Sequence, residues 1–154
     1  MERCISMTQR VALVALVILM SMLTGPAHAE RTVVLVTNAD CPIESLSMLE
    51  VRKAYFGLIA SHDKLSVRAF RLNNDDDLTR VFYQTVVAMS EKSYERRLLS
   101  MLLKYGTPRP PEFEDVDSLV AAIRRSDCGI AYMWGEDAAS HDAVKSIRLL
   151  WQSD

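Results

Sequence analysis

Short apolar segments and amphipathic segments alternate along most of this chain of 154 residues. Residues 32–37 are β-branched and apolar, which indicates a central strand that is buried on both faces of a sheet. Residues 65–72 and 129–133 indicate two further strands, and residues 146–150 indicate a last one. These four segments together predict a small β-sheet.

Between the strands, apolar residues recur at helical spacing in four segments. The first helix is expected from Met48 to about Phe56, because Ser47 and Glu50 form a capping box at its start and Gly57 ends it. Strands that alternate with helices predict an α/β fold with helices on both faces of the sheet. The apolar positions of the other three helices are Leu78, Val81, Phe82, Val86 and Met89; then Tyr94, Leu98, Met101, Leu102 and Tyr105, after a start near Ser90; and Val116, Leu119, Val120 and Ile123.

The N-terminal segment has the composition of a secretory signal peptide. A basic start with Arg3 and Arg10 is followed by the apolar residues 11–20 and by an Ala-x-Ala end at Ala29. The alternative, a membrane anchor, is disfavoured because the apolar run is shorter than the roughly twenty residues that a bilayer requires. We therefore expect a signal peptide over residues 1–29, a single mature domain over residues 30–154 and a periplasmic location.

The mature domain carries a small negative charge. Cleavage removes two of the 18 basic residues, Arg3 and Arg10, and one of the 20 acidic residues, Glu2, which leaves a net charge of −3. This balance gives no overall basic bias, so nucleic acid is not expected as a partner.

Cys41 and Cys128 remain in the mature domain after Cys4 has been removed with the signal. Two cysteines in an exported protein indicate a disulfide, and the alternative is a pair of buried free thiols. A bridge would close a loop of roughly ninety residues and contribute on the order of 4 kcal/mol in the chain-entropy description.

Sequence patterns of catalysis and of metal binding are missing. The mature domain has two histidines, His62 and His141, which lie in expected loops and outside any metal-spaced cluster. No Gly-x-Ser-x-Gly elbow, P-loop or dinucleotide-binding turn occurs. We expect a protein that is not an enzyme and that holds no metal and no cofactor.

An acidic turn links the second strand to the second helix. Asp75, Asp76 and Asp77 lie where the first N–H groups of a helix attract anions. Three interpretations stay open at this point. The aspartates cap the helix, hold a cation without the spacing of calcium loops, or gate a ligand.

Several segments, taken in order, resemble one lobe of the phosphate-type periplasmic solute-binding proteins, which have the type II binding-protein fold. The resemblance covers roughly residues 32–135, nearly the whole mature domain. The segments are the first strand with Asn38, the run Leu-Ser-Met-Leu-Glu-Val-Arg-Lys-Ala-Tyr-Phe-Gly that ends at Gly57, the strand with Arg71, the helix with Phe82, and Cys-Gly-Ile-Ala-Tyr-Met from Cys128.

The resemblance implies a three-layer αβα single lobe with a small mixed sheet, in which the first strand runs antiparallel to residues 129–133. That pairing would place Cys41 near Cys128 and favours the disulfide. In the family, the turn after the arginine strand donates N–H and hydroxyl groups to an oxyanion, and two lobes close around the ligand. The ligand-facing positions carried over to this chain are Arg71, Asn74, Asp75 and Thr79.

Two departures from the family change the expected ligand. The chain is long enough for one lobe only, so a homodimer would have to supply the opposite wall of a cleft. Asp75, Asp76 and Asp77 replace the family's small residues, and two carboxylates ~4 Å apart repel by about 4 kcal/mol at an effective dielectric near 20. Phosphate is therefore disfavoured, and Arg71 either faces a ligand or pairs with the aspartates.

Two functions remain from the sequence. The first is an exported solute-binding-like protein, related to phosphate ABC-transporter substrate-binding proteins, that binds a small solute without catalysis. The second is a periplasmic interaction or sensory module that has lost its ligand and contacts a membrane transporter or sensor. Its candidate contact loop is residues 105–113, with Pro108, Pro110 and Pro111, and the alternative for that loop is a plain connection between helices.

Overall fold

The computed structural model describes residues 30–58, 60–62 and 65–153. The expected signal peptide, residues 1–29, lies outside the described residues, and its cleavage stays a prediction. Among the residues described, no helix is both long enough and apolar enough to cross a membrane.

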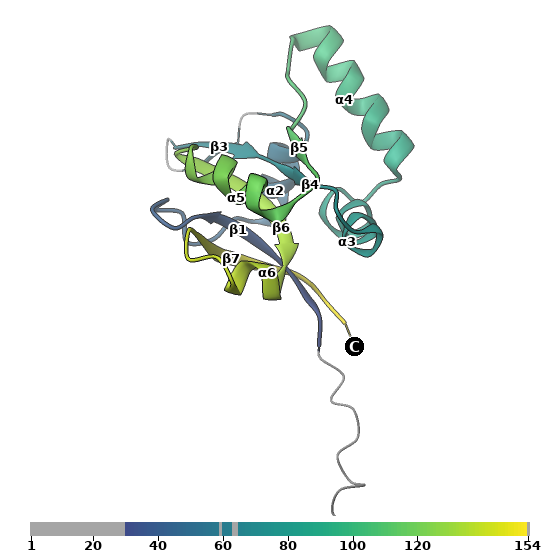
Figure 1. Cartoon of the computed structure of the whole chain (residues 1–154). Coiled ribbons are helices and arrows are strands. Elements are labelled where there is room, and N and C mark those ends of the chain that lie inside the picture. Colours follow the sequence, from purple (N-terminus) through teal and green to yellow (C-terminus); the bar gives the residue numbers. More distant parts are fainter. Residues whose placement is uncertain (1–29, 59, 63–64, 154) are drawn as a thin grey trace, which may run out of the picture.

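A five-stranded mixed sheet forms the centre of the fold (Figure 1). Its strands, in spatial order, are β2 (Ala60–His62), β3 (Leu65–Ala69), β6 (Cys128–Trp134), β1 (Thr32–Asn38) and β7 (Val144–Gln152). β1 runs antiparallel to both β6 and β7, whereas β3 runs parallel to β6 and antiparallel to β2. The antiparallel pairing of the first strand with β6, which the resemblance implied, is confirmed.

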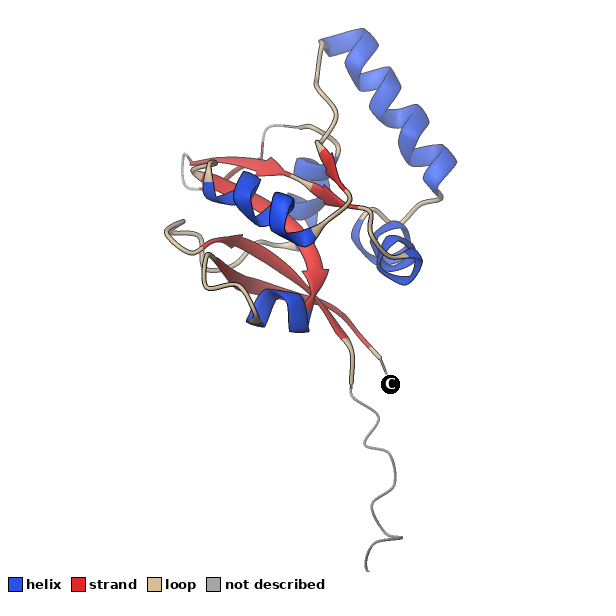
Figure 2. Cartoon of the chain, viewed as in Figure 1, coloured by secondary structure: helices blue, strands red, loops and turns tan. Residues whose placement is uncertain are grey.

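Helices cover both faces of this sheet, as the alternating pattern predicts (Figure 2). α5 (Val116–Arg124) lies on one face, where Ile123 approaches Gly129 closely. α2 (Met48–Tyr55) lies on the other face, where the Tyr55 ring contacts Tyr132. Positions 129 and 132 point to opposite faces because successive side chains of a strand alternate. The α/β class and its three layers are therefore confirmed.

The strand expected over residues 65–72 is in fact two strands, so its predicted continuity is wrong. β4 (Arg71–Leu72) leaves the main sheet and pairs in parallel with β5 (Glu112–Phe113). The physical reason is the buried side chain of Arg71, because a buried charge requires a charged partner. Glu112 supplies a carboxylate oxygen 3.1 Å from its guanidinium.

The helical region after the acidic turn is less regular than its apolar spacing suggests. α3 (Asp76–Val81) continues into a π-helical turn (Phe82–Val86), and α4 (Glu91–Tyr105) follows. The wider turn allows the neighbouring rings of Phe82 and Tyr83 both to be buried. Apolar residues at regular helical spacing do not reveal such a turn in the sequence.

Helix boundaries follow the predicted signals. The Ser47 hydroxyl accepts from the N–H of Glu50 at 3.3 Å, and the Glu50 carboxylate accepts from the N–H of Ser47 at 2.8 Å. Gly57 ends α2 with a φ of 68°, a conformation that favours glycine. Three short elements escape the pattern because they are too short to show a period: β2, which contains His62, β5, and α6 (Gly135–Ala139).

A disulfide joins Cys41 to Cys128, whose Cα atoms are 5.3 Å apart. It links the turn after β1 to the first residue of β6, the strand that pairs with β1. Both cysteines are buried. Of the two alternatives for these residues, the structure therefore contains the bridge and not the free thiols.

His141 connects α5 to the end of α6. Its Nδ1 lies 2.8 Å from the carbonyl oxygen of Asp137, and its Nε2 lies 3.1 Å from the carboxylate of Asp117. Hydrogen bonding to the Asp137 carbonyl and then to Asp117 raises the pKa of His141. The histidine lies in a loop as expected, but it is paired rather than simply solvated.

The double substitution Cys41→Ser with Cys128→Ser should lower the free energy of unfolding by about 2–5 kcal/mol, because the bridge constrains a long loop of the unfolded chain. Urea unfolding of the mature protein, followed by circular dichroism, measures the loss. Reductant should lower the stability of the wild-type protein to the same level. Equal stability of oxidised wild type and variant would contradict the stabilising role of the bridge.

The substitution His141→Gln should destabilise the protein in acid and progressively less at higher pH. Because the folded pKa is raised, protonated His141 stabilises the fold fully below about pH 6.5, the ordinary value of an unfolded histidine. That contribution is lost as the pH rises through the folded pKa. Melting temperatures of both proteins across this range test the prediction, and a difference independent of pH would refute it.

Candidate functional site

Arg71 is the most buried charged side chain among the described residues, with 6 % of its surface exposed. Its Nη1 lies 3.2 Å from the Glu95 carboxylate and 3.1 Å from the Glu112 carboxylate, and its Nη2 donates to the Tyr83 hydroxyl at 2.9 Å. Burial alone would lower the pKa of Arg71, but the nearby Tyr83 hydroxyl and other surrounding groups raise it above its ordinary value. The guanidinium therefore stays charged, and its carboxylate partners are glutamates. The expected alternative of pairing with the three aspartates is wrong.

Aromatic rings enclose this guanidinium. The ring centroids of Phe82, Tyr83 and Tyr94 lie 5.2, 5.8 and 5.3 Å from its Cζ, within the range of cation–π attraction. The hydroxyls of Tyr55, Tyr94 and Tyr132 each donate to a main-chain carbonyl, and burial raises the pKa of all three. These tyrosines are thus neutral supports of the fold. We refer to Arg71, its two glutamates and the rings of Phe82, Tyr83 and Tyr94 as the arginine core.

Asp75 caps α3 with its own carboxylate. Its Oδ1 accepts from the N–H of Asp77 at 2.7 Å and from the N–H of Leu78 at 3.0 Å. These are the N–H groups that a bound anion would use at the start of a helix. The capping interpretation is confirmed for Asp75, whose carboxylate already engages these two donors.

Other side chains of the acidic turn also have partners within the chain. The Asp75 carboxylate lies 3.9 Å from the Arg31 guanidinium, and Asp77 forms an ion pair with Arg80. The Thr79 hydroxyl donates to the side-chain oxygen of Asn73 at 3.2 Å. Of the four positions carried over from the family, Arg71, Asp75 and Thr79 are therefore engaged internally, and Asn74 is exposed.

The aspartates do not form a metal site with their neighbours. Within residues 30–58, 60–62 and 65–153, no group of three or more His, Cys, Asp or Glu side chains has the arrangement to hold a metal ion. The cation interpretation of the acidic turn therefore has no geometric support.

A hollow of about 500 Å³ opens beside the acidic turn, between the start of β1, the end of β7 and α3. The rings of Trp134 and Trp151 meet there at a centroid distance of 6.3 Å, and the Arg31 guanidinium lies 3.7 Å from the Trp134 ring centroid. The indole N–H of Trp134 is buried and has no acceptor among the described residues. We refer to this site as the tryptophan hollow; its lining residues are Arg31, Asp77, Arg80, Val81, Gln84, Trp134, Trp151 and Ser153.

The sequence analysis missed the tryptophan hollow, although a signal for it was present. The chain has two tryptophans, and both line the hollow. Val33 pairs with Trp134 on one side of β1 and with Trp151 on the other. The two rings therefore meet because β6 and β7 both run antiparallel to β1, one on each side, and place their tryptophans opposite the same residue. The sequence pattern does not specify this register.

The sequence matches no family model and no curated protein. The chain is similar in structure to an ABC-type phosphate transport receptor from Vibrio cholerae, with 10 % identity and a TM-score of 0.54 over 78 % of this chain and 46 % of that chain. It is also similar to a putative phosphate ABC transporter substrate-binding protein with bound phosphate from Clostridium perfringens, with 13 % identity and a TM-score of 0.57 over 78 % and 45 % of the two chains. A possible phosphate binding protein from Planctomyces limnophilus gives 13 % identity and a TM-score of 0.52 over 78 % and 42 %.

These similarities concern the fold, because the identities are low. The chain spans less than half the length of each of the three proteins. The resemblance found in the sequence is confirmed at this level. The chain has the fold of one lobe of the phosphate ABC-transporter substrate-binding proteins, in a short form.

Proposed function

We propose that this chain is an exported, non-catalytic solute-binding-like protein whose ligand is a small polar solute other than free phosphate. The fold supports a binding role, since it is shared with lobes of transport receptors. The observation that carries the proposal is the tryptophan hollow beside the acidic turn, which is lined by aromatic residues and by side chains of both charges.

Free phosphate is disfavoured by charge and by occupancy. The helix N–H groups at Asp77 and Leu78 already donate to the Asp75 carboxylate. The Arg71 guanidinium already bridges Glu95 and Glu112. An oxyanion would have to displace internal carboxylates and would approach further negative charge, which repels it.

The lining of the hollow suggests the chemistry of the ligand. The partly exposed ring of Trp151 offers flat apolar surface, while Arg31, Asp77 and Arg80 present charges of both signs. Ligand sites commonly combine apolar surface with a few polar groups that fix orientation. A zwitterionic or hydroxylated solute with a flat apolar part suits this lining.

A single lobe encloses less of a ligand than two lobes do. Binding to the monomer should therefore be weak, and a homodimer that faces two hollows toward one another would strengthen it. Sedimentation of the protein with and without the solute distinguishes binding by a monomer from binding by a homodimer.

A second candidate function is a periplasmic module that contacts a membrane transporter or sensor. The specific observation in its favour is that the arginine core and the Asp75 cap use the family's anion donors internally. A lobe that has lost its original ligand in this way would retain its surface for a protein partner.

Phosphate and sulfate should leave the melting temperature of the wild-type protein unchanged, because the N–H groups of Asp77 and Leu78 at the start of α3 already donate to the Asp75 carboxylate. The triple substitution Asp75→Ser, Asp76→Gly and Asp77→Thr should create phosphate binding, worth about 2.7 kcal/mol of stabilisation at a hundredfold excess over Kd. Thermal unfolding of both proteins, at increasing phosphate concentration and constant ionic strength, measures this stabilisation.

The matched control for this experiment is Asp115→Ser, which replaces an equivalent cap on α5, where the Asp115 carboxylate accepts from the N–H of Ser118 at 2.7 Å. It should gain no response to phosphate. Millimolar phosphate binding by the wild-type protein would contradict the proposal that the oxyanion site is closed. A triple variant that folds but ignores phosphate would show that the aspartates act only as a helix cap.

Solute binding should change the intrinsic tryptophan fluorescence, because both tryptophans line the hollow. Titration with free amino acids, sugars and aromatic acids tests the proposed ligand class. Gln84→Leu should weaken binding of any solute that responds, whereas Gln152→Leu, outside the lining, should not. The absence of a response across the whole panel, in fluorescence and in melting temperature, would overturn solute binding at this site.

A further inference from the structure

The apolar stripe of α4 extends beyond the body of the protein. Figure 1 shows α4 projecting from the rest of the fold, with its C-terminal end far from the sheet. Tyr94 and Leu98, near the start of the stripe, are buried. Leu102 and Tyr105 continue the stripe at helical spacing, yet 40 % and 72 % of their surfaces are exposed. The same face is thus buried at one end and free at the other.

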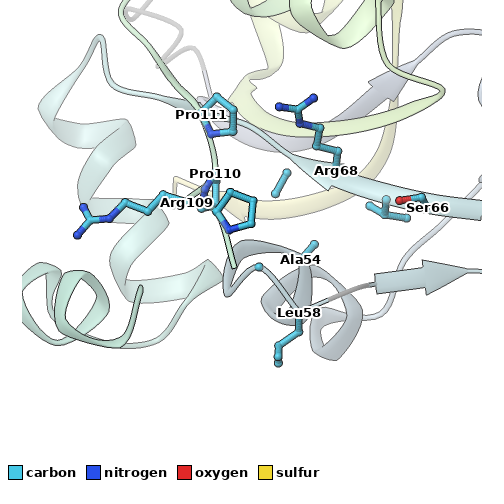
Figure 3. A pocket seen from close by; sticks show the side chains of 11 residues that line it. Ala54, Leu58, Ser66, Arg68, Arg109, Pro110 and Pro111 are labelled. Carbon is cyan, nitrogen blue, oxygen red and sulfur yellow. The ribbon is translucent and has the colours of Figure 1, made fainter. Parts of the chain in front are cut away.

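This free end forms one wall of a groove. Met101 and Tyr105 of α4 face Gly57 and Leu58, at the end of α2, across a hollow of about 460 Å³ that Thr107 closes. A second hollow of about 310 Å³ shares Gly57 and Leu58 with the first, so the two are adjacent. Figure 3 shows the second hollow, with Pro110 and Pro111 on one side and Ala54 and Leu58 below. We refer to the two hollows together as the overhang groove.

The walls of the overhang groove are held in place. Gly57 has a φ of 68°, and a Cβ at this position would lie 2.4 Å from the Cγ2 of Thr107, so the end of α2 and the loop after α4 are in close contact. Pro108, Pro110 and Pro111 restrict the loop itself. A groove that is already ordered loses little conformational entropy when it binds.

The rim of the overhang groove is basic, although the protein as a whole is acidic. Arg68 and Arg109 border the second hollow, and Figure 3 shows Arg109 extending outward from it. Arg97 and Lys104 lie beside Met101 and Tyr105 on α4. Arg68, Arg97 and Lys104 form no ion pair with any carboxylate in the part of the chain that the structure describes. Arg109 pairs with Glu95, but the other three cations give the rim a positive charge, whereas the mature domain has a net charge of −3.

We propose that the overhang groove binds an acidic amphipathic segment of a partner protein, with its carboxylates on the basic rim. The apolar side of the segment would lie against Leu58 and Tyr105, which line the groove, and against Leu102 beside Tyr105 on α4. A second copy of this chain would bring the same basic rim against itself, and like charges oppose that contact. A membrane surface is flat, whereas this site is concave and suits an inserted segment. The groove shares no lining residue with the tryptophan hollow, so the proposal does not depend on solute binding.

The probe is a synthetic amphipathic peptide of about four helical turns, with leucines on one side and glutamates on the other. The control peptide has the same leucines, with lysines in place of the glutamates. Both are titrated into the purified mature protein and followed by amide NMR shifts. The glutamate peptide should shift the amides of Gly57, Leu58 and Thr107, and the lysine peptide should bind at least about tenfold more weakly.

Two substitutions on α4 make the assignment specific. Leu102→Ser with Tyr105→Ser should weaken the binding of the glutamate peptide about tenfold or more, because Tyr105 lines the first hollow and Leu102 continues the apolar stripe of α4 beside it. Leu103→Ser is the matched control. It also removes an exposed leucine of α4, but position 103 lies on the opposite side of the helix from Tyr94, so affinity should stay within about twofold.

Vesicles of phosphatidylglycerol and sedimentation of the free protein complete the test. Equal affinity for the two peptides, no measurable binding of the glutamate peptide, or equal losses in the groove variant and in Leu103→Ser would each overturn the proposal. Binding to the vesicles in place of the peptide would assign the surface to lipid. Self-association that the groove variant abolishes would assign it to a second copy.

Discussion

The burial of Arg71 is the constraint on which much of this structure depends. A charge removed from water costs several kcal/mol unless carboxylates and hydrogen-bonding groups surround it. Here the carboxylates come from Glu95 on α4 and Glu112 on β5, and a hydroxyl comes from Tyr83 in the π-helical turn. Each of these elements is thereby placed around one guanidinium.

Several irregular features of the fold follow from that requirement. β4 leaves the main sheet to pair with β5, which carries Glu112. The π-helical turn lets Phe82 and Tyr83 both reach the arginine core. Glu95 also accepts from Arg109 at 2.6 Å, so the proline-containing loop is tied to the same network. The arginine core thus connects the π-helical turn, the projecting helix α4 and the loop that borders the overhang groove.

The same network bears on function. Guanidinium groups and the first N–H groups of a helix are natural donors for an oxyanion. In this chain internal carboxylates engage both, those of Glu95 and Glu112 at the Arg71 Nη1 and that of Asp75 at the helix. The buried Nε of Arg71 has no acceptor among the described residues. The surfaces that remain available are of a different kind. One is the tryptophan hollow with charges of both signs, and the other is an apolar groove with a basic rim.

Much of the fold could be predicted from the sequence, because caps and periodic apolar positions are local signals. Ser47, Glu50 and Gly57 set the bounds of α2 as expected, and β1 and β6 lie where β-branched and apolar runs indicate them. The site could be predicted only in part. The capping role of Asp75 is local, but the partners of Arg71 are 24 and 41 residues away in sequence, and no pattern near Arg71 indicates them. Trp134 and Trp151 meet through strand register, which apolar alternation does not fix.

The central claim is that the charge of Arg71 serves the fold and not a ligand. NMR of the Arg71 guanidinium group, in the mature protein with and without phosphate, tests this most directly. The claim predicts guanidinium protons that exchange slowly with water, since the side chain is buried, and resonances that phosphate does not move. Rapid exchange, or a shift of these resonances that saturates with phosphate, would show that Arg71 faces a ligand and would contradict the account.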